Sequence, residues 1–346
     1  MRNILIGIMD SNVGGVNRFI IDYILQHKDN KYIILSNSQI NKIYLEELKD
    51  YTIKIVPSVV KPVKLFCVSC EIIKENKIDE VYLNVSTNLF YPVLKAAYNC
   101  GVEHRIVHSH SSYSAEGTFI KRCIIVFINN LLKNKVKNKS TVRKACSDKA
   151  ANWLFGPNSD YEFVYNKVSK SRFLFSPAVR NEYRLKYNLE DKIVVGFVGG
   201  FNYPKNVFYF LKLAKEIKKN MQNFCIVMIG DGNLKGVFEK KIKKLRLDNY
   251  FILLGNKGNI NDFYNMFDCF VMPSRFEGLP IVGIEAQVNG LKCFFSDKIT
   301  KKVIITDEAE IFCLKNLAML AKSIIKIQSD THNITPKMEF NNFLTK

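Results

Sequence analysis

Short apolar segments rich in β-branched residues alternate with longer segments of mixed polarity along most of the chain. In the first half we expect six strands, at Ile4–Met9, Tyr32–Ser36, Lys54–Val56, Val81–Val85, Arg105–Ser109 and Val142–Ser147. Helices fit between them, for example at Asn17–Gln26 and Tyr91–Cys100. This alternation is typical of a parallel sheet whose two faces are covered by helices.

The same rhythm starts again near residue 193. Ile193–Gly199 reads as a strand that ends in a glycine turn, and we expect a helix from Pro204 to about Lys219. Further strands are expected at Phe224–Ile229, Tyr250–Leu254, Cys269–Met272 and Lys292–Phe295. The restart predicts two doubly wound α/β domains, 1–176 and 177–346, joined near Ser176–Asp191. Since ligands bind at the carboxyl ends of such strands, two facing sheets would place a ligand in the cleft between the domains.

Length and composition agree with this division. A chain of 346 residues, 47% of them hydrophobic, suits two domains of about 150 to 180 residues. Met1–Asn3 leads directly into the first strand without a secretory signal, so we expect a cytoplasmic location in which the nine cysteines are reduced. Cys67 and Cys70 form one CxxC pair, which we interpret as two helix cysteines, with a redox or zinc role as the alternative.

The net charge of +19 allows two interpretations. Lysine outnumbers arginine by 41 to 10, a bias that AT-rich coding alone would produce. The physical alternative is that the charge attracts polyanions such as anionic lipid headgroups, lipid diphosphates or nucleotides. One basic cluster follows the apolar stretch Ile120–Leu132 and would form either an amphipathic element on an anionic membrane surface or a solvated face: Lys133, Lys135, Lys137, Lys139, Arg143 and Lys144.

Two segments of the first domain carry candidate chemistry. Gly14 and Gly15 lie between the first strand and the first helix, where helix amides can meet an anion, although a tight turn accounts for them about as well. His108 and His110 lie at the end of another strand and could share a target, because residues two apart point to the same face. A metal pair, a core histidine with a chance neighbour and a polar group at the sheet edge are the three alternatives, and the strand-end position favours the last.

The second domain has two such segments. Gly199 and Gly200 form a turn that precedes Lys205 at the start of the expected helix, where an ammonium group and helix amides together suit a diphosphate. Glu277 precedes a helix that we expect to begin near Pro280, and Glu285 lies inside that helix. Carboxylates accept hydrogen bonds from sugar hydroxyls, and the N–H groups of Gly278 and Leu279 can meet phosphate. A general acid and base pair is the alternative for the two glutamates.

These segments resemble the retaining family 4 glycosyltransferases, which have the GT-B fold of two Rossmann-like domains facing across a cleft. Glu277 and Glu285, with seven residues between them, resemble the family's E-x7-E motif. Other matches follow in the family's order, at Gly14–Val16, His108–His110, Ala145–Ser147, Trp153–Gly156, Gly199–Asn206 and Gly230–Gly232. The run from Glu285 to Ile299 is especially similar to enzymes of bacterial capsule and exopolysaccharide assembly.

The resemblance implies roles for individual residues. Glu277 would bind the donor sugar's hydroxyls and Glu285 the ribose. Lys205 would neutralise the leaving diphosphate, with backbone N–H groups supplied by Gly15, Gly278 and Leu279. His110 would lie beside the donor sugar and help to stabilise the transition state.

The family also implies retention of anomeric configuration without a metal or other cofactor. This agrees with the absence of any D-x-D motif from the sequence. Gly200 replaces the arginine that usually accompanies the family's lysine, and Arg275 is a candidate to compensate.

We therefore expect a transferase that moves a sugar from a nucleotide-sugar, most simply a UDP-sugar, to a glycan or a polyprenyl-diphosphate-linked acceptor during cell-surface polysaccharide synthesis. The basic surface would suit that acceptor and the inner face of the cytoplasmic membrane. The alternatives are a nucleotide-sugar 2-epimerase or a phosphorylase of the same fold, and a non-enzymatic polyanion-binding protein. Nucleic-acid motifs are not apparent, so no nucleic-acid partner is expected.

Overall fold

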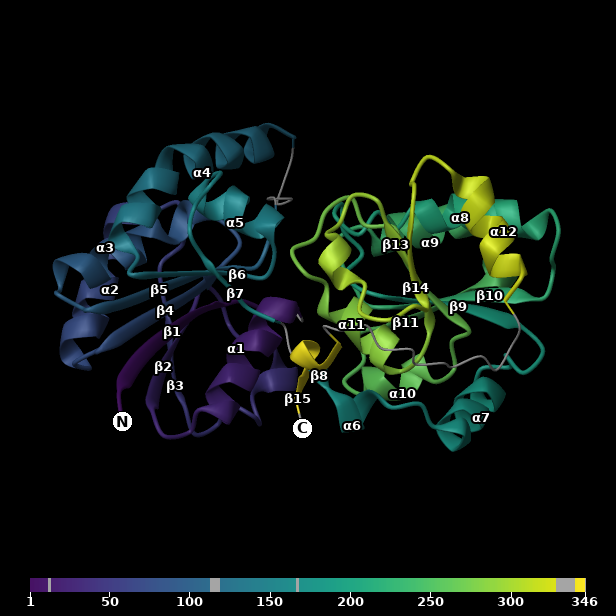
Figure 1. The fold of residues 1–346 in the computed structure, drawn as a ribbon, viewed down its shortest axis with the longest axis horizontal. Coiled ribbons are helices and arrows are strands. Elements are labelled where there is room, and N and C mark those ends of the chain that lie inside the picture. Colours follow the sequence, from purple (N-terminus) through teal and green to yellow (C-terminus); the bar gives the residue numbers. More distant parts are fainter. Residues whose placement is uncertain (12–13, 113–118, 166–167, 328–339, 346) are drawn as a thin grey trace. The chain divides into compact units, whose positions relative to one another are not determined.

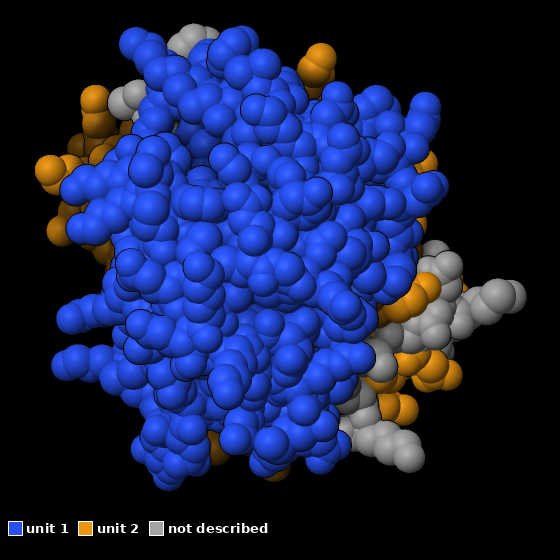
Figure 2. All heavy atoms as spheres, turned by 90° about the vertical axis from the view of Figure 1, so that its left-hand side faces the viewer, with its two compact units in different colours: residues 1–164 blue, residues 165–346 orange. Residues whose placement is uncertain are grey.

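The computed structural model describes residues 1–11, 14–112, 119–165, 168–327 and 340–345, which divide into two compact units. Unit 1 comprises residues 1–164 and unit 2 comprises residues 165–346 (Figure 2). The border therefore precedes the expected one at 176, because the short helix α6 (Lys170–Phe173) packs against helices α10 (Ile260–Tyr264) and α11 (Ile281–Val288) of unit 2.

Unit 1 contains a parallel sheet of seven strands in the order β3-β2-β1-β4-β5-β6-β7 (Figure 1). The strands are β1 (Asn3–Met9), β2 (Lys31–Ser36), β3 (Thr52–Ile55), β4 (Glu80–Val85), β5 (His104–Ser109), β6 (Val142–Ala145) and β7 (Glu162–Phe163). All six strands expected in this half are confirmed. The two-residue strand β7 was not predicted, because two residues are too short for a period to show.

Helices cover both faces of this sheet. Helix α1 (Gly15–Gln26) lies on one face, and its buried Ile20, Ile21 and Ile24 pack against Ile4 and Ile6 of β1. On the other face lie α2 (Pro62–Glu75), α3 (Tyr91–Asn99), α4 (Phe119–Lys139) and α5 (Asp148–Phe155), each in contact with the next (Figure 1). Between the elements are the 3-10 turns η1 (Lys42–Tyr44) and η2 (Asn88–Phe90).

Unit 2 repeats the arrangement with six parallel strands in the order β11-β10-β9-β12-β13-β14. They are β9 (Ile193–Val198), β10 (Phe224–Ile229), β11 (Phe251–Gly255), β12 (Cys269–Met272), β13 (Lys292–Ser296) and β14 (Ala309–Phe312). Strand β14 was not predicted, because Glu310 interrupts its short apolar pattern. Two further short strands, β8 (Val168–Ser169) and β15 (Leu344–Thr345), pair with each other.

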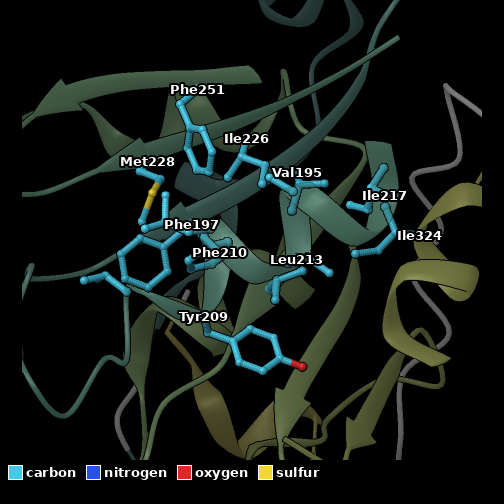
Figure 3. Packing of buried hydrophobic residues seen from close by; sticks show 14 of the residues in the cluster. Val195, Phe197, Tyr209, Phe210, Leu213, Ile217, Ile226, Met228, Phe251 and Ile324 are labelled. Carbon is cyan, nitrogen blue, oxygen red and sulfur yellow. The ribbon is translucent and has the colours of Figure 1, made fainter. Parts of the chain in front are cut away.

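The core of unit 2 lies between its sheet and one layer of helices. Helices α8 (Tyr209–Lys218), α9 (Lys235–Lys244) and α12 (Leu317–Ile325) lie on this face, whereas α10 and α11 lie on the other (Figure 1). Between the sheet and these helices, Phe197, Phe210 and Leu213 are fully buried and pack with Met228 and Ile324 (Figure 3). Such a core fixes the strand ends rigidly, which is what a binding site on the adjoining loops requires.

Helix α7 (Pro177–Lys186) is attached to unit 2 by a buried ionic group. Arg180 and Arg184 both pair with the carboxylate of Asp268, at 2.5 and 3.1 Å, and the backbone N–H of Val194 donates to the same carboxylate at 2.7 Å. The remaining short helical turns are η3 (Asp248–Tyr250), η4 (Lys301–Val303) and η5 (Phe340–Phe343). Among the described helices, none combines the length and the apolar content needed to cross a membrane.

Candidate functional site

The two sheets share a strand order that reverses at an internal position. In unit 2 the order reverses between β9 and β12, and in unit 1 between β1 and β4. Loops that leave neighbouring strands in opposite directions at such a point open a crevice outside the carboxyl ends of the strands, where ligands bind in doubly wound sheets. Lys205 follows β9 and Glu277 follows β12, so these two predicted residues lie at the switch point of unit 2.

The loop after β9 differs from the expected structure. Lys205 does not lie at the start of a helix, because residues 203–208 form turns and α8 begins only at Tyr209. Asn206 has a positive φ of 54°, a left-handed conformation that interrupts a helix and that asparagine tolerates better than most residues. The ammonium group of Lys205 is therefore presented by a turn, without the helix amides that the sequence suggested.

Neighbouring loops hold this turn in place by backbone contacts. The N–H of Arg275 donates to the carbonyl oxygen of Pro204 at 2.7 Å, and the side-chain amide of Asn206 donates to the carbonyl of Pro273 at 3.0 Å. On the other side, a Cβ added to Gly230 would lie 2.1 Å from the carbonyl oxygen of Gly199. The loops after β9, β10 and β12 are thus packed backbone to backbone, which preorganises the switch point.

Lys205 and Glu277 form an ion pair within this frame. The Nζ of Lys205 lies 2.7 Å from Oε1 of Glu277, and the two side chains are only 18% and 14% exposed. The Coulomb attraction between a partly buried cation and anion is stronger than it would be in water, because the surrounding dielectric constant is lower. Together they offer a cation suited to phosphate and an acceptor suited to hydroxyl groups, side by side.

Glu285 lies deeper, on α11, and is 8% exposed. The hydroxyl of Tyr264 donates to its Oε2 at 2.7 Å. Burial and the adjacent carboxylate raise the pKa of Tyr264 well above its ordinary value, so the phenol keeps the proton that it donates. Tyr264 was not identified from the sequence, because nothing in the pattern around α10 distinguishes it from a core tyrosine.

The remaining predicted donor residues of unit 2 lie on the same loops. Arg275 is exposed, and its guanidinium lies 4.7 Å from the centre of the Tyr203 ring, two residues before Lys205 in the chain. Gly278 and Leu279 are buried in the bend just before α11, whose amino-terminal cap is Pro280 as expected. The structure therefore brings Gly199, Lys205, Glu277 and these residues to one edge of the unit 2 sheet.

Gly14 and Gly15 lie at the corresponding edge of unit 1. Gly15 is the first residue of α1 and Gly14 its cap, and both are exposed. The turn is held by the buried side chain of Asn17, which accepts from the N–H of Asp10 at 3.2 Å and donates to its carbonyl at 2.9 Å. The amides at the amino terminus of a twelve-residue helix are able to bind an anion, and this role of Gly14 and Gly15 stays a prediction.

His110 and His108 have different surroundings, although their ring centres are 3.9 Å apart. His108 is fully buried and meets the hydroxyl of Tyr82 at 3.2 Å, so it is a core histidine. His110 is partly exposed at the end of β5, and its Nε2 donates to Oδ1 of Asn84 at 2.9 Å. The idea that both rings share one target is therefore not supported, and only His110 remains a candidate.

Burial lowers the pKa of His110 to about 3, so the ring is neutral at neutral pH. Its Nε2 carries the proton given to Asn84, which leaves Nδ1 as a hydrogen-bond acceptor. Asn84 was missed in the sequence, although an asparagine inside the apolar strand β4 is a signal that could have identified it.

No group of three or more histidine, cysteine or acidic side chains in the described ranges is arranged to hold a metal ion. Cys67 and Cys70 lie within α2 as free thiols, as the first of the two interpretations predicted.

Comparisons with known proteins show what this chain is similar to. The family model described as "Glycosyl transferases group 1" matches residues 179–339, which lie wholly within unit 2. The chain is 36% identical over 217 residues to the "Putative glycosyltransferase EpsF" of Bacillus subtilis (strain 168), an alignment that covers 60% of this chain and 55% of that protein.

A second relative is the "UDP-Gal:alpha-D-GlcNAc-diphosphoundecaprenol alpha-1,3-galactosyltransferase" of Escherichia coli. It is 26% identical over 292 residues, covering 79% of this chain and 72% of that enzyme. Among solved structures, Anabaena Alr3699/HepE in complex with UDP and glucose superposes with a TM-score of 0.78 at 15% identity, covering 96% of this chain and 92% of that one. This structural likeness confirms the GT-B fold that the sequence predicted.

Proposed function

We propose that this chain, whose residues 179–339 match the family model of the group 1 glycosyl transferases, transfers a sugar from a UDP-sugar to a glycan or lipid-diphosphate-linked acceptor in polysaccharide synthesis. The observation that carries the proposal is the ion pair of Lys205 and Glu277 at the switch point of unit 2. A cation suited to phosphate lies there beside a carboxylate suited to hydroxyl groups, and a nucleotide-sugar contains both phosphate and hydroxyl groups.

In the proposed reaction the bond between the anomeric carbon and the diphosphate oxygen breaks, and UDP leaves. The acceptor hydroxyl forms the new glycosidic bond on the same face of the sugar and releases its proton. Lys205 stabilises the negative charge that develops on the leaving diphosphate, and the backbone N–H groups of Gly15, Gly278 and Leu279 assist it. No metal is required for this charge stabilisation.

The other site residues hold the donor. Glu277 accepts hydrogen bonds from the donor sugar's hydroxyls, and Glu285, held by Tyr264, accepts from the ribose. Arg275 supplies a second cation near the diphosphate in place of the side chain that Gly200 lacks. His110, neutral and positioned by Asn84, uses its Nδ1 to accept a hydrogen bond from the donor sugar in the transition state.

UDP as the nucleotide leaving group is supported by the descriptions of two similar proteins. The E. coli enzyme is described as using UDP-galactose and a diphosphoundecaprenol acceptor, and the Anabaena protein was solved with UDP and glucose. The specific sugar is best found by a thermal-shift panel of nucleotide-sugars, because a bound donor stabilises the folded protein by mass action.

The decisive experiment measures UDP release from the selected UDP-sugar with and without a lipid-diphosphate-linked or oligosaccharide acceptor, in the presence of EDTA. Acceptor-dependent release that EDTA leaves unchanged, and a product with the donor's anomeric configuration, are expected. Conversion of the donor without an acceptor would identify an epimerase instead. Absence of release with every donor, together with unchanged nucleotide-sugar binding in Glu277→Ala, would refute the proposal.

A further inference from the structure

Helix α4 presents a line of large apolar side chains to solvent. Ile120, Ile124, Phe127 and Leu131 are 72%, 52%, 64% and 61% exposed. Spacings of four, three and four residues place them within about 60° of one another around the helix, along roughly 16 Å of its length. We call these four residues the apolar stripe.

The opposite side of α4 fixes the direction in which the stripe points. Ile125 and Val136 are buried there, and between them Asn129 is fully buried. Its side-chain oxygen accepts from the N–H of Asn88 at 2.7 Å, and its amide donates to the carbonyl of Trp153 at 2.8 Å. Turning the stripe inward would break these buried hydrogen bonds, so its exposure is a stable property of the fold.

The same helix is strongly basic. It has no acidic residue among its 21 positions and carries six cations: Lys121, Arg122, Lys133, Lys135, Lys137 and Lys139. Lys121 and Lys135 are exposed, and a turn of about 100° per residue places both beside the stripe on one side. An apolar face bordered by lysines is the pattern of a helix that lies in the interface of an anionic bilayer.

We propose that α4 docks this protein on an anionic lipid bilayer, with the apolar stripe immersed at the level of the acyl-chain boundary and the lysines near the lipid phosphates. A second copy of the chain fits the surface poorly, because it would bring an identical basic helix against this one. A soluble anion would engage the lysines and leave the stripe exposed. The proposal concerns a surface of unit 1 and does not depend on the proposed transferase reaction.

The test is flotation of the full chain with vesicles of phosphatidylglycerol and phosphatidylcholine in equal parts, and with vesicles of phosphatidylcholine alone. These vesicles contain no sugar acceptor, and no nucleotide is added, so transferase activity does not enter the result. Binding to the anionic vesicles that weakens with added salt is expected, and little binding to the neutral ones.

Two variants address the two parts of the surface. Phe127→Ser with Leu131→Ser should lower the vesicle partition coefficient by on the order of 10²-fold, because two large side chains no longer enter the apolar region. Lys121→Gln with Lys135→Gln should lower it by about 10-fold or more, since each lysine near an anionic surface contributes about fivefold. All four side chains are exposed, so both variants should fold, which thermal unfolding verifies.

Matched controls come from unit 2. Val237→Ser with Met319→Ser removes two exposed apolar side chains, and Lys240→Gln with Lys244→Gln on α9 removes the same charge. Both control proteins should bind vesicles like the wild type. Equal binding to neutral and anionic vesicles, or wild-type binding by the Phe127 and Leu131 variant, would overturn the proposal. The proposal would also be overturned if the wild type forms a dimer but does not bind vesicles, and if the Phe127 and Leu131 variant abolishes that dimer.

Discussion

Replacing Glu277 with glutamine should lower the preference of the protein for a UDP-sugar over UDP. The substitution keeps the size of the side chain but removes the negative charge that lies 2.7 Å from the ammonium of Lys205. Lys205 would then meet an incoming diphosphate without first giving up a carboxylate partner. The sugar, in contrast, would lose a charged acceptor for its hydroxyl groups.

The geometry of the pair sets the size of both effects. At 2.7 Å and an effective dielectric constant of about 20, the Coulomb attraction is roughly 6 kcal/mol, most of which desolvation cancels. With side chains 18% and 14% exposed, the net coupling should lie between that of surface pairs and that of buried pairs, at about 1–3 kcal/mol. The affinity for UDP should therefore stay constant or rise. A lost charge-assisted hydrogen bond costs about 1.5–3 kcal/mol, so the preference for UDP-sugar over UDP should fall by about 10-fold or more.

Isothermal titration calorimetry with UDP and with the UDP-sugar found in the thermal-shift panel measures both affinities. Glu239→Gln on α9 is the matched control, because it removes the same charge from an exposed position and should change neither affinity. Equal weakening of UDP and UDP-sugar in Glu277→Gln would contradict the division of roles between Glu277 and Lys205. Unchanged affinities for both ligands would remove Glu277 from the donor site.

Three single substitutions give further predictions. Tyr264→Phe removes the hydroxyl that donates to buried Glu285, so UDP binding should weaken by about 1–3 kcal/mol in calorimetry, and unchanged binding would show that Glu285 does not need this donor. His110→Gln should reduce the loss of stability in acid. The pKa of His110 is about 3 in the folded protein and about 6.5 in the unfolded chain, so only the unfolded chain takes up a proton between these values. The free energy of unfolding of the wild type therefore falls as the pH decreases through this range. Urea unfolding between pH 6.5 and pH 4 should show a slope that is smaller in the variant by up to about 1.4 kcal/mol per pH unit, and identical slopes would contradict a ring that stays neutral in the folded protein. Gly230→Ala should destabilise unit 2 by more than about 1 kcal/mol in thermal unfolding, because the new methyl group would lie 2.1 Å from a backbone oxygen at a φ of 138°, whereas Gly236→Ala has open space and should be neutral or stabilising.

Much of the architecture is readable from local patterns. The strands that are buried on both faces, such as Phe224–Ile229 and Cys269–Met272, were predicted with their observed bounds, because a continuous apolar run of this length is typical of a central strand in a parallel sheet. Short or polar elements such as β7 and β14 escaped prediction, since their pairing depends on neighbours and not on a period of their own. The helix expected from Pro204 begins only at Tyr209, because Asn206 adopts a left-handed conformation that its hydrogen bond to a distant loop supports.

The candidate site divides in the same way. The spacing of Glu277 and Glu285, the glycine turns and Lys205 identified the donor-binding segments, because their chemistry and order along the chain are local properties of the sequence. That Lys205 pairs with Glu277, that Tyr264 holds Glu285 and that Asn84 sets the tautomer of His110 depends on residues brought together from different strands and helices. Equally, the basic and apolar residues of α4 were visible in the sequence, but only the packing around Asn129 decided which face of the helix meets solvent. Sequence patterns record what each segment is able to do, whereas burial and partners are long-range properties that arise only when the chain has folded.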